Sequence, residues 1–267
     1  MIFAKQVCGI DGSPTSEAAA EQAARLANPG TDVLLVTVLD PWNPVAGLED
    51  QSAQTRDAYR QQESERLLEA AAARWPPSRV RTMAIDGWAP RALIDQARAE
   101  GSELICLGMH GRRRSTAFVL GSVATTVLHE AACSVYLARV AQDADRFPRT
   151  VVIGVDGSAH ALRAAAVAAD LVERFGVELR PVIAVGAGRG LLGKASANVD
   201  LDATRSTFPQ AVIDTRAPVE ALVSTAKECE ADILIVGARG LRGVRAMGSV
   251  SERVAHEATC SVLVVRP

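Results

Sequence analysis

The chain has 267 residues, of which 48% are hydrophobic and 22% are charged, and its formal net charge at pH 7 is −2. This length suits two domains, and the hydrophobic share is enough for a sizeable core, so the composition excludes a disordered chain. The nearly balanced charge argues against a protein whose main task is to coat nucleic acid.

Short β-rich runs alternate with helical patterns through the first half of the chain. The predicted strands lie near residues 6–10, 33–39, 79–84, 103–107 and 134–139. The predicted helices lie near residues 14–27, 52–74, 90–100 and 121–131. Two helix starts are well marked, because Ser13 can cap free N–H groups ahead of Pro14, and Pro90 suits a first turn. Such an alternation requires parallel strands joined by right-handed crossovers.

The second half of the chain repeats the first. Three blocks return in the same order, each followed here by its repeat: VCGIDGS at 7–13 and VIGVDGS at 152–158, LICLGMHG at 104–111 and ILIVGARG at 233–240, GSVATTVLHEAACSVYLAR at 121–139 and GSVSERVAHEATCSVLVVR at 248–266. We predict two copies of one domain, at residues 1–141 and 149–267, joined near the polar segment 141–150. Each copy is expected to be an α/β, doubly wound, Rossmann-like domain with five parallel strands and ligands at the strand ends.

The second copy is shorter between its second and third strands. The offset between matched blocks falls from 145 residues at the first block to 127 at the last. Residues 186–208 have no apolar helical stripe where the first copy has its long helix, and we predict an irregular or mobile loop there. Before that loop, the helix after Ser158 is expected to bury one apolar face, made of Leu162, Ala165, Ala166, Ala169 and Val172.

The cysteines and the N-terminal residues indicate a cellular compartment. The five cysteines form neither a CxxC pair nor a zinc-type cluster with histidine: Cys8, Cys106, Cys133, Cys229 and Cys260. An odd number of cysteines in mainly apolar runs is typical of reduced thiols in the cytosol. No secretory signal is visible, and no apolar stretch approaches the roughly 18 residues that span a bilayer. We therefore expect a soluble, cytoplasmic protein.

A glycine-patterned loop follows the fourth predicted strand, with the spacing Gly108-x2-Gly111-x9-Gly121-Ser122. Gly108 and Gly111 would let backbone N–H groups approach an anion without a Cβ in the way. Gly121 and Ser122 start a helix whose free N–H groups favour phosphate, and the Ser122 hydroxyl could reach phosphate or a bound Mg²⁺. Taken singly, each residue could also be a turn glycine or a helix cap. The loop lacks the Gly-Lys-Ser/Thr ending of a Walker A motif.

This spacing resembles the ATP-binding branch of the universal stress protein (UspA-like) family, and the resemblance covers the chain twice, as in the tandem form. It implies an adenine nucleotide alpha hydrolase-like fold that binds ATP with Mg²⁺. The residues that it assigns to the nucleotide site of the first copy are Gly9, Asp11, Val38, Gly108, Gly111, Gly121, Ser122 and Val123. Asp11 is implied to contact the ribose or the adenine edge, and Val38 to pack against the base.

The second copy has residues in matching places, namely Asp156, Val185, Gly237, Gly240, Gly248, Ser249 and Val250. Only seven residues separate Gly240 from Gly248, whereas nine separate Gly111 from Gly121. Two missing residues remove several ångströms of reach, at up to ~3.5 Å per residue. Whether the second copy binds nucleotide therefore stays open.

Other features of the two loops have a functional and a structural interpretation. Several arginines could neutralise a triphosphate or could be solvated, namely Arg112, Arg113, Arg114, Arg239, Arg242 and Arg245. A formal GxGxxG motif at 188–193 lacks the following helix that a dinucleotide site requires, so we interpret it as a loop.

The repeats of the last helix and last strand also contain residues with reactive side chains. The pairs His129–Glu130 and His256–Glu257 are interpreted as helix ends, because no third catalytic partner is visible. Cys133 and Cys260 are interpreted as small buried residues that precede the last strand of each copy.

The resemblance implies a nucleotide-gated stress-response regulator rather than a catalyst. We assign no catalytic residue, because no general base is evident beside the phosphates, and at most slow hydrolysis is implied. The two copies are expected to pair through their last strands, SVYLAR and SVLVVR, as family dimers do, and two chains could dimerise further. Two alternatives stay open: a nucleotide-independent scaffold of the same fold, and an adenylating enzyme, although neither an SGGxDS-type loop nor a HIGH-type motif is present.

Overall fold

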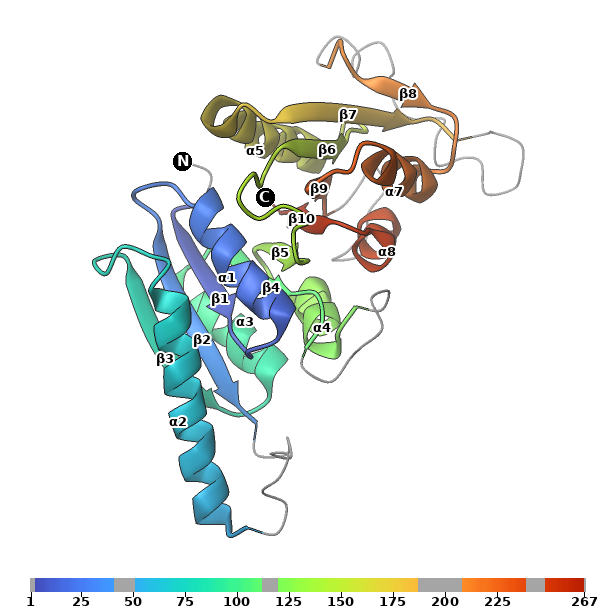
Figure 1. Ribbon diagram of the computed structural model, residues 1–267. Coiled ribbons are helices and arrows are strands. Elements are labelled where there is room, and N and C mark those ends of the chain that lie inside the picture. Colours follow the sequence, from blue (N-terminus) through green and yellow to red (C-terminus); the bar gives the residue numbers. More distant parts are fainter. Residues whose placement is uncertain (1–2, 41–50, 112–119, 187–207, 239–247, 267) are drawn as a thin grey trace.

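The computed structural model describes residues 3–40, 51–111, 120–186, 208–238 and 248–266. These residues form two α/β halves that share one ten-stranded sheet, in the order β3-β2-β1-β4-β5-β10-β9-β6-β7-β8 (Figure 1). Read from the centre outward, both halves have the same strand order, and strands within each half are parallel. The predicted fold class, with five strands in each half, is confirmed.

The first half contains five strands and four helices in the described residues. The strands are β1 (Lys5–Gly9), β2 (Asp32–Leu39), β3 (Val80–Asp86), β4 (Leu104–Gly108) and β5 (Ser134–Ala138). The helices are α1 (Pro14–Leu26), α2 (Ala53–Ala72), α3 (Ala89–Glu100) and α4 (Ser122–Glu130). Both helix-start predictions are confirmed, since Ser13 caps α1 and Pro90 lies in the first turn of α3.

The described part of the second half repeats this arrangement. Its strands are β6 (Thr150–Gly154), β7 (Glu178–Ala184), β8 (Val212–Asp214), β9 (Ile233–Gly237) and β10 (Ser261–Val265). Its helices are α5 (Ala159–Phe175), α7 (Pro218–Glu228) and α8 (Ser249–Glu257). The segment predicted to be an irregular loop lies, over residues 187–207, outside the described residues. Of the helices that are described, none is long and apolar enough to span a bilayer.

Helix α5 buries a different face from the predicted one. Leu162 and Val172 are 47% and 37% exposed. The buried residues are instead Ala161, Ala164, Val167, Ala168 and Leu171. Alanines occupy both arcs of this helix, so helical periodicity alone does not choose between them. Packing on the sheet selects the arc that contains Val167 and Leu171.

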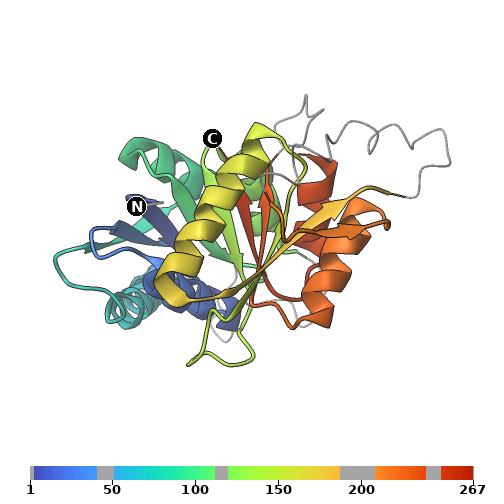
Figure 2. The ribbon, with the colours of Figure 1, turned by 90° about the horizontal axis from the view of Figure 1, so that it is seen from above.

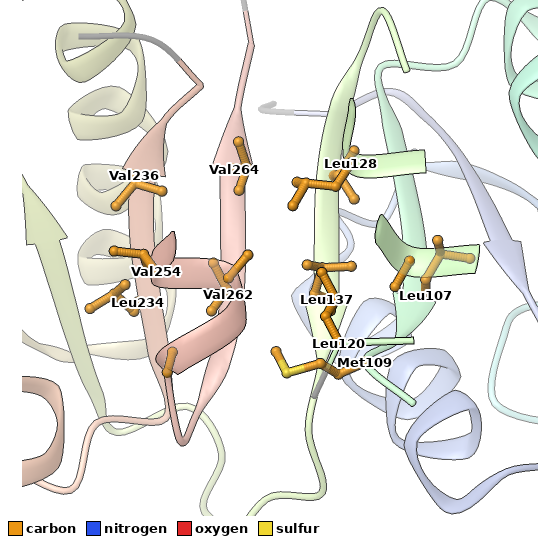
Figure 3. Close-up of a cluster of buried hydrophobic side chains, with 14 of the residues drawn as sticks. Leu107, Met109, Leu120, Leu128, Leu137, Leu234, Val236, Val254, Val262 and Val264 are labelled. Carbon is orange, nitrogen blue, oxygen red and sulfur yellow. The ribbon is translucent and has the colours of Figure 1, made fainter. Parts of the chain in front are cut away.

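Helices cover both faces of the sheet. One hydrophobic cluster lies under α3, α4, α7 and α8, and a second lies under α1, α2 and α5. Figure 2 shows α5 (yellow) lying against strands near the middle of the sheet, where it packs on β9 and β10. The first cluster runs from Leu107 and Leu137 in one half to Val262 and Leu234 in the other (Figure 3). Each of the two clusters therefore continues from one half into the other.

The halves join at a seam, which is the antiparallel pair β5 and β10. The paired residues are Val262 with Leu137, Leu263 with Tyr136, and Val264 with Val135. This is the pairing of last strands that the family resemblance implies. Because the seam is antiparallel, the carboxyl ends of the strands in the two halves point to opposite edges of the sheet.

Side chains reinforce the seam reciprocally. The Arg139 N–H donates to Ser261 Oγ at 3.1 Å, and the Arg266 N–H donates to Ser134 Oγ at 3.0 Å. The Arg266 guanidinium also donates to the carbonyl oxygen of Leu128, at the end of α4, at 2.6 Å. These bonds tie each half to polar groups of the other.

Candidate functional site

The predicted site residues of the first half meet at the switch point of its sheet. Strands β1 and β4 are neighbours, but β1 leads to α1 on one face and β4 leads to α4 on the other. Asp11 follows β1, and the segment Gly108–Gly111 begins at the last residue of β4, so both lie at the edge where these strands end. In open α/β sheets, ligands bind in the crevice that such a divergence creates.

Asp11 is positioned by the turn that begins α1. Its Oδ1 accepts the Ser13 N–H at 2.9 Å and the Ser13 hydroxyl at 2.6 Å. Its Oδ2 lies beside the glycine loop, because a Cβ built on Gly111 would be 3.1 Å from that oxygen. One carboxylate oxygen is thus used by the turn, and the other faces Gly111.

Gly108 has a structural role that differs from the predicted one. A Cβ at this position would lie 2.5 Å from the Ser16 nitrogen and 2.6 Å from Thr15 Oγ1, at the start of α1. Such distances are shorter than any van der Waals contact. Gly108 therefore allows α1 to pack on the end of β4, and the prediction that it exposes its backbone to an anion does not account for this packing.

The loop after β4 is also attached to α1 through His110. The His110 carbonyl oxygen accepts a hydrogen bond from the Thr15 hydroxyl and lies 3.1 Å from the Ser13 hydroxyl oxygen. The His110 ring lies beside the seam, with its Nε2 3.3 Å from Arg139 Nη1. Burial lowers the pKa of the Arg139 guanidinium. The sequence reasoning missed Thr15 and Arg139, because only the folded sheet brings them to this loop.

The N-terminus of α4 lies at the same edge. Gly121 is its N-cap residue, and no described side chain caps the helix. The Gly121 N–H donates to the Met109 carbonyl oxygen at 2.8 Å, which fixes the helix start against the end of β4. Ser122 is exposed and Val123 is half-buried against the core. Among the described residues, the first N–H groups of α4 therefore have no capping side chain, and free N–H groups at a helix start favour an anion.

Gly9 and Val38 have apolar surroundings. A Cβ on Gly9 would lie 2.6 Å from Leu107 Cδ2, so this glycine serves packing between β1 and its neighbour β4. Val38 is half-buried on the face that α3 and α4 cover, and it pairs in register with Ile85. Val38 thus offers an apolar surface close to the edge.

The second half repeats most of this geometry at the opposite edge. Asp156 Oδ1 accepts the Ser158 N–H at 3.0 Å, and a Cβ on Gly237 would lie 2.8 Å from the backbone carbon of His160. The Gly248 N–H donates to the Ala238 carbonyl oxygen at 2.7 Å. The following residues resemble their counterparts, with Ser249 exposed and Val250 half-buried. Both loops are therefore closed at the base by the same bond.

Val185 is not the counterpart of Val38, although the sequence comparison matched them. The Ile10 N–H donates to Val36 O, and in the second half the Val155 N–H donates to Val182 O. This register makes Ala184 the equivalent of Val38. Val185 instead packs on the opposite face, because a shift of one residue along a strand reverses the side chain. The apolar surface at this point is smaller in the second half.

Several predicted residues lie outside the described residues. They are Gly240, the loop arginines Arg112, Arg113, Arg114, Arg239, Arg242 and Arg245, and the GxGxxG segment at 188–193. In the described part of the chain, no cluster of three or more His, Cys, Asp or Glu side chains is arranged to hold a metal ion.

The two His-Glu repeats end helices, as the sequence predicts. His129 lies in the last turn of α4 and His256 in the last turn of α8. His129 Nε2 also lies 3.1 Å from an oxygen of Glu252, across the seam. Glu257 pairs with Arg253 on its own helix.

The cysteines are free thiols, and most of them are buried. Cys260 is buried as predicted, whereas Cys133 is only half-buried. Burial raises the pKa of Cys8 and of Cys260 to about 12, so both thiols stay protonated near neutral pH.

Comparison with known proteins identifies the family. The model of the universal stress protein family matches residues 3–139 and 148–266. A universal stress protein of Mycolicibacterium smegmatis is 29% identical over 292 aligned positions, which cover 97% of this chain and 96% of the relative. One of Mycobacterium tuberculosis is 28% identical, with 97% and 95% covered.

Solved structures show the same fold. The crystal structure of a universal stress protein from Archaeoglobus fulgidus superposes with a TM-score of 0.73 at 19% identity, covering 100% of this chain and 97% of that one. The likeness therefore extends over both halves and the seam between them. The chain belongs to the universal stress protein family, and it has the tandem form with two domains of that family in one polypeptide.

Proposed function

We propose that this chain is an ATP-binding regulator of the stress response, in which the first half holds the nucleotide and the second half responds to it. One observation carries the proposal: Asp11, Gly111 and the uncapped N-terminus of α4 meet at the switch point of the first half. Each has a plausible structural role alone. Together they form a site with an acceptor for hydroxyl groups, bare backbone and free N–H donors.

The chemistry of this edge fits a nucleoside triphosphate. The free N–H groups and the positive end of α4 favour phosphate, and the exposed Gly111 leaves its backbone accessible beside them. Asp11 Oδ2 can accept a ribose hydroxyl, and Val38 supplies an apolar surface for the base. Mg²⁺ would be held mainly through the phosphates, with the exposed Ser122 hydroxyl within the same helix turn as a further ligand.

Helix α4 supplies the connection to the second half. Its N-terminus lies at the proposed phosphate site, and at its other end the Leu128 carbonyl oxygen accepts a bond from Arg266 of the second half. His129 in the last turn faces Glu252 of α8. A ligand that binds the start of this nine-residue helix therefore binds an element whose other end contacts the second half.

The test is binding of Mg-ATP to the purified chain after exhaustive removal of nucleotide. At 100 times the Kd, ATP should raise the melting temperature by roughly 5 °C or more. Gly111→Val should remove this shift, because the new side chain presses on Asp11 and covers the bare backbone. Gly121→Val should do the same, since its Cβ would lie 3.3 Å from the Met109 carbonyl oxygen.

Gly248→Val is the matched control, because it changes the equivalent helix start in the second half. It shows how much of the lost ATP-dependent melting-temperature shift comes from disturbing a helix start anywhere in the chain. The remainder is due to the site in the first half. A wild-type chain whose melting temperature ignores ATP would overturn the proposal and favour the nucleotide-independent scaffold. That scaffold has one specific support: packing of α1 and α5 alone explains Gly108 and Gly237.

A further inference from the structure

Trp88 is the most exposed large aromatic side chain in the described part of the chain. It is 59% exposed, whereas Trp75 and Tyr136 are buried in the core. It is also the N-cap residue of α3 and makes no side-chain capping bond. Neither packing in the core nor capping explains a tryptophan at this position.

Trp88 lies at the same edge and on the same face as the proposed nucleotide site. The Gly87 N–H beside it donates to the Leu39 carbonyl oxygen at 3.2 Å, next to Val38. Helix α3 packs over β1 and β2 and beside α4, and both helices begin at this edge. The start of α3, where Trp88 lies, is therefore separated from Asp11 by the end of β2, which contains Val38, and the start of α4 lies alongside.

The second half has a different residue at this position. The segments are IDGWAP at 85–90 and IDTRAP at 213–218, so Arg216 takes the place of Trp88. Arg216 is bonded back to its own strand, with Nη2 2.6 Å from Asp214 Oδ2, and to Glu228 of α7 at 3.3 Å. An ion pair thus occupies in the second half the place that an exposed ring occupies in the first.

We infer that the Trp88 indole is the face on which the purine ring of the bound nucleotide stacks, with the half-buried Val38 below the ring. The inference rests on the proposed function and adds a positioning residue to that site. An exposed aromatic ring can stack on the ring of a nucleobase. Such stacking depends little on which base is bound, but it requires that the ligand has a base. It also favours binding by the first half, because the second half has no aromatic ring at this position and its Arg216 is paired with Asp214 and Glu228.

The test compares two ligands, Mg-ATP and inorganic tripolyphosphate with Mg²⁺, by calorimetric titration of the full chain. Trp88→Ala should weaken ATP binding roughly tenfold and leave tripolyphosphate binding unchanged, since tripolyphosphate has no base to stack. Trp88→Phe should recover most of the ATP affinity. Tyr59→Ala is the matched control, because it removes an exposed ring from α2, on the opposite face of the sheet.

A second measurement uses the indole itself. All three tryptophans lie in the first half, at 42, 75 and 88, so a Trp42→Phe and Trp75→Phe chain leaves Trp88 as the only emitter. ATP should quench its fluorescence, and tripolyphosphate should not.

The outcomes separate the two ideas. If Gly111→Val abolishes ATP binding while Trp88→Ala binds ATP as tightly as wild type, the stacking inference is wrong and the proposed function stands. Equal weakening of ATP and tripolyphosphate by Trp88→Ala, or a change in oligomeric state with unchanged affinity, also overturns the inference. If the wild-type chain binds neither ligand, both ideas are overturned.

Discussion

Two glycines at the ends of β4 and β9 let a helix pack directly on a strand end. At Gly108 a Cβ would stand 2.5 Å from the Ser16 nitrogen, and at Gly237 it would stand 2.8 Å from the His160 backbone carbon. Both obstacles are backbone atoms at the start of α1 or α5, which cannot move aside like the end of a flexible side chain. The residue type at these positions is therefore set by packing, whatever the site binds.

We predict that Gly108→Ala lowers the free energy of unfolding by about 1–3 kcal/mol, because α1 must shift away from β4 to admit the methyl group. Urea unfolding followed by circular dichroism measures this loss. Ser122→Ala, on the exposed start of α4, is the control and should change stability by less than about 0.5 kcal/mol. A Gly108→Ala chain as stable as wild type would show that the start of α1 is free to yield.

At this scale the sequence predicts which residues gather but not what each does. Gly108 and Gly111 look alike in the sequence, yet Gly108 packs against the start of α1 whereas Gly111 faces a carboxylate oxygen of Asp11. The difference depends on the distance between two segments about 95 residues apart, as shown by the bond between Thr15 and His110. No local pattern contains that distance.

Helix α4 is the element that both halves hold. Its first turn closes on β4 through Gly121, and its last carbonyl groups meet the Arg266 guanidinium, which also donates to the Cys133 carbonyl oxygen at 3.1 Å. Arg266 is only 6% exposed, so these carbonyl oxygens have little access to water. Hydrogen bonds from a buried charged donor contribute more to stability than neutral ones, because the acceptors would otherwise be buried without a partner.

Replacing this arginine tests the hold on α4. Arg266→Met keeps the aliphatic stem but leaves two carbonyl oxygens without their donor, so we predict a loss of about 2–3 kcal/mol in the free energy of unfolding. Urea unfolding gives the value. Arg253→Met is the matched control: Arg253 pairs with Glu257 on the surface of α8, and its loss should cost less than about 0.5 kcal/mol. Equal effects of the two changes would contradict a special role for Arg266.

The sequence predicts helices and strands closely where the pattern of side chains is compatible with only one type of element. The long helix α2 and the strands of the first half lie close to their predicted ranges, since turn residues and apolar periodicity agree there. In α5 the pattern leaves two choices, because alanine is compatible with both arcs, and the predicted arc is not the one that is buried. Only the larger side chains Val167 and Leu171, once placed over the sheet, decide which arc is buried.

At the scale of the molecule, the repeat predicts the architecture but not how the strands of the second half align with one another. Three matched blocks imply two similar five-stranded units, the family resemblance implies that they join through their last strands, and Leu263 does pair with Tyr136 between β10 and β5. Matching Val185 with Val38 failed, because the spacing between β6 and β7 differs by one residue from that between β1 and β2. Hydrogen bonds between neighbouring strands fix that register, and the sequence of one strand does not show how it aligns with the next.

The continuous sheet predicts that the chain unfolds as one unit. The core crosses the seam, and Arg174 of α5 donates to the Leu26 carbonyl oxygen of α1 at 2.7 Å, so neither half can open without exposing the other. The tryptophans, all in the first half, report that half alone, whereas circular dichroism reports both. Leu234→Ala, in β9, should therefore move the fluorescence transition and the circular dichroism transition together to lower urea.

Ile105→Ala is the matched change in β4, since Ile105 pairs with Val7 as Leu234 pairs with Val152, and both side chains are fully buried. Each change should cost about 2–5 kcal/mol and shift both signals by the same amount. Independent halves would behave differently: Leu234→Ala would split the circular dichroism curve and leave the tryptophan signal where it was. Coincident shifts in both variants mean that a ligand bound at one edge of the sheet stabilises the opposite edge as well, which is what a regulator built from two fused halves requires.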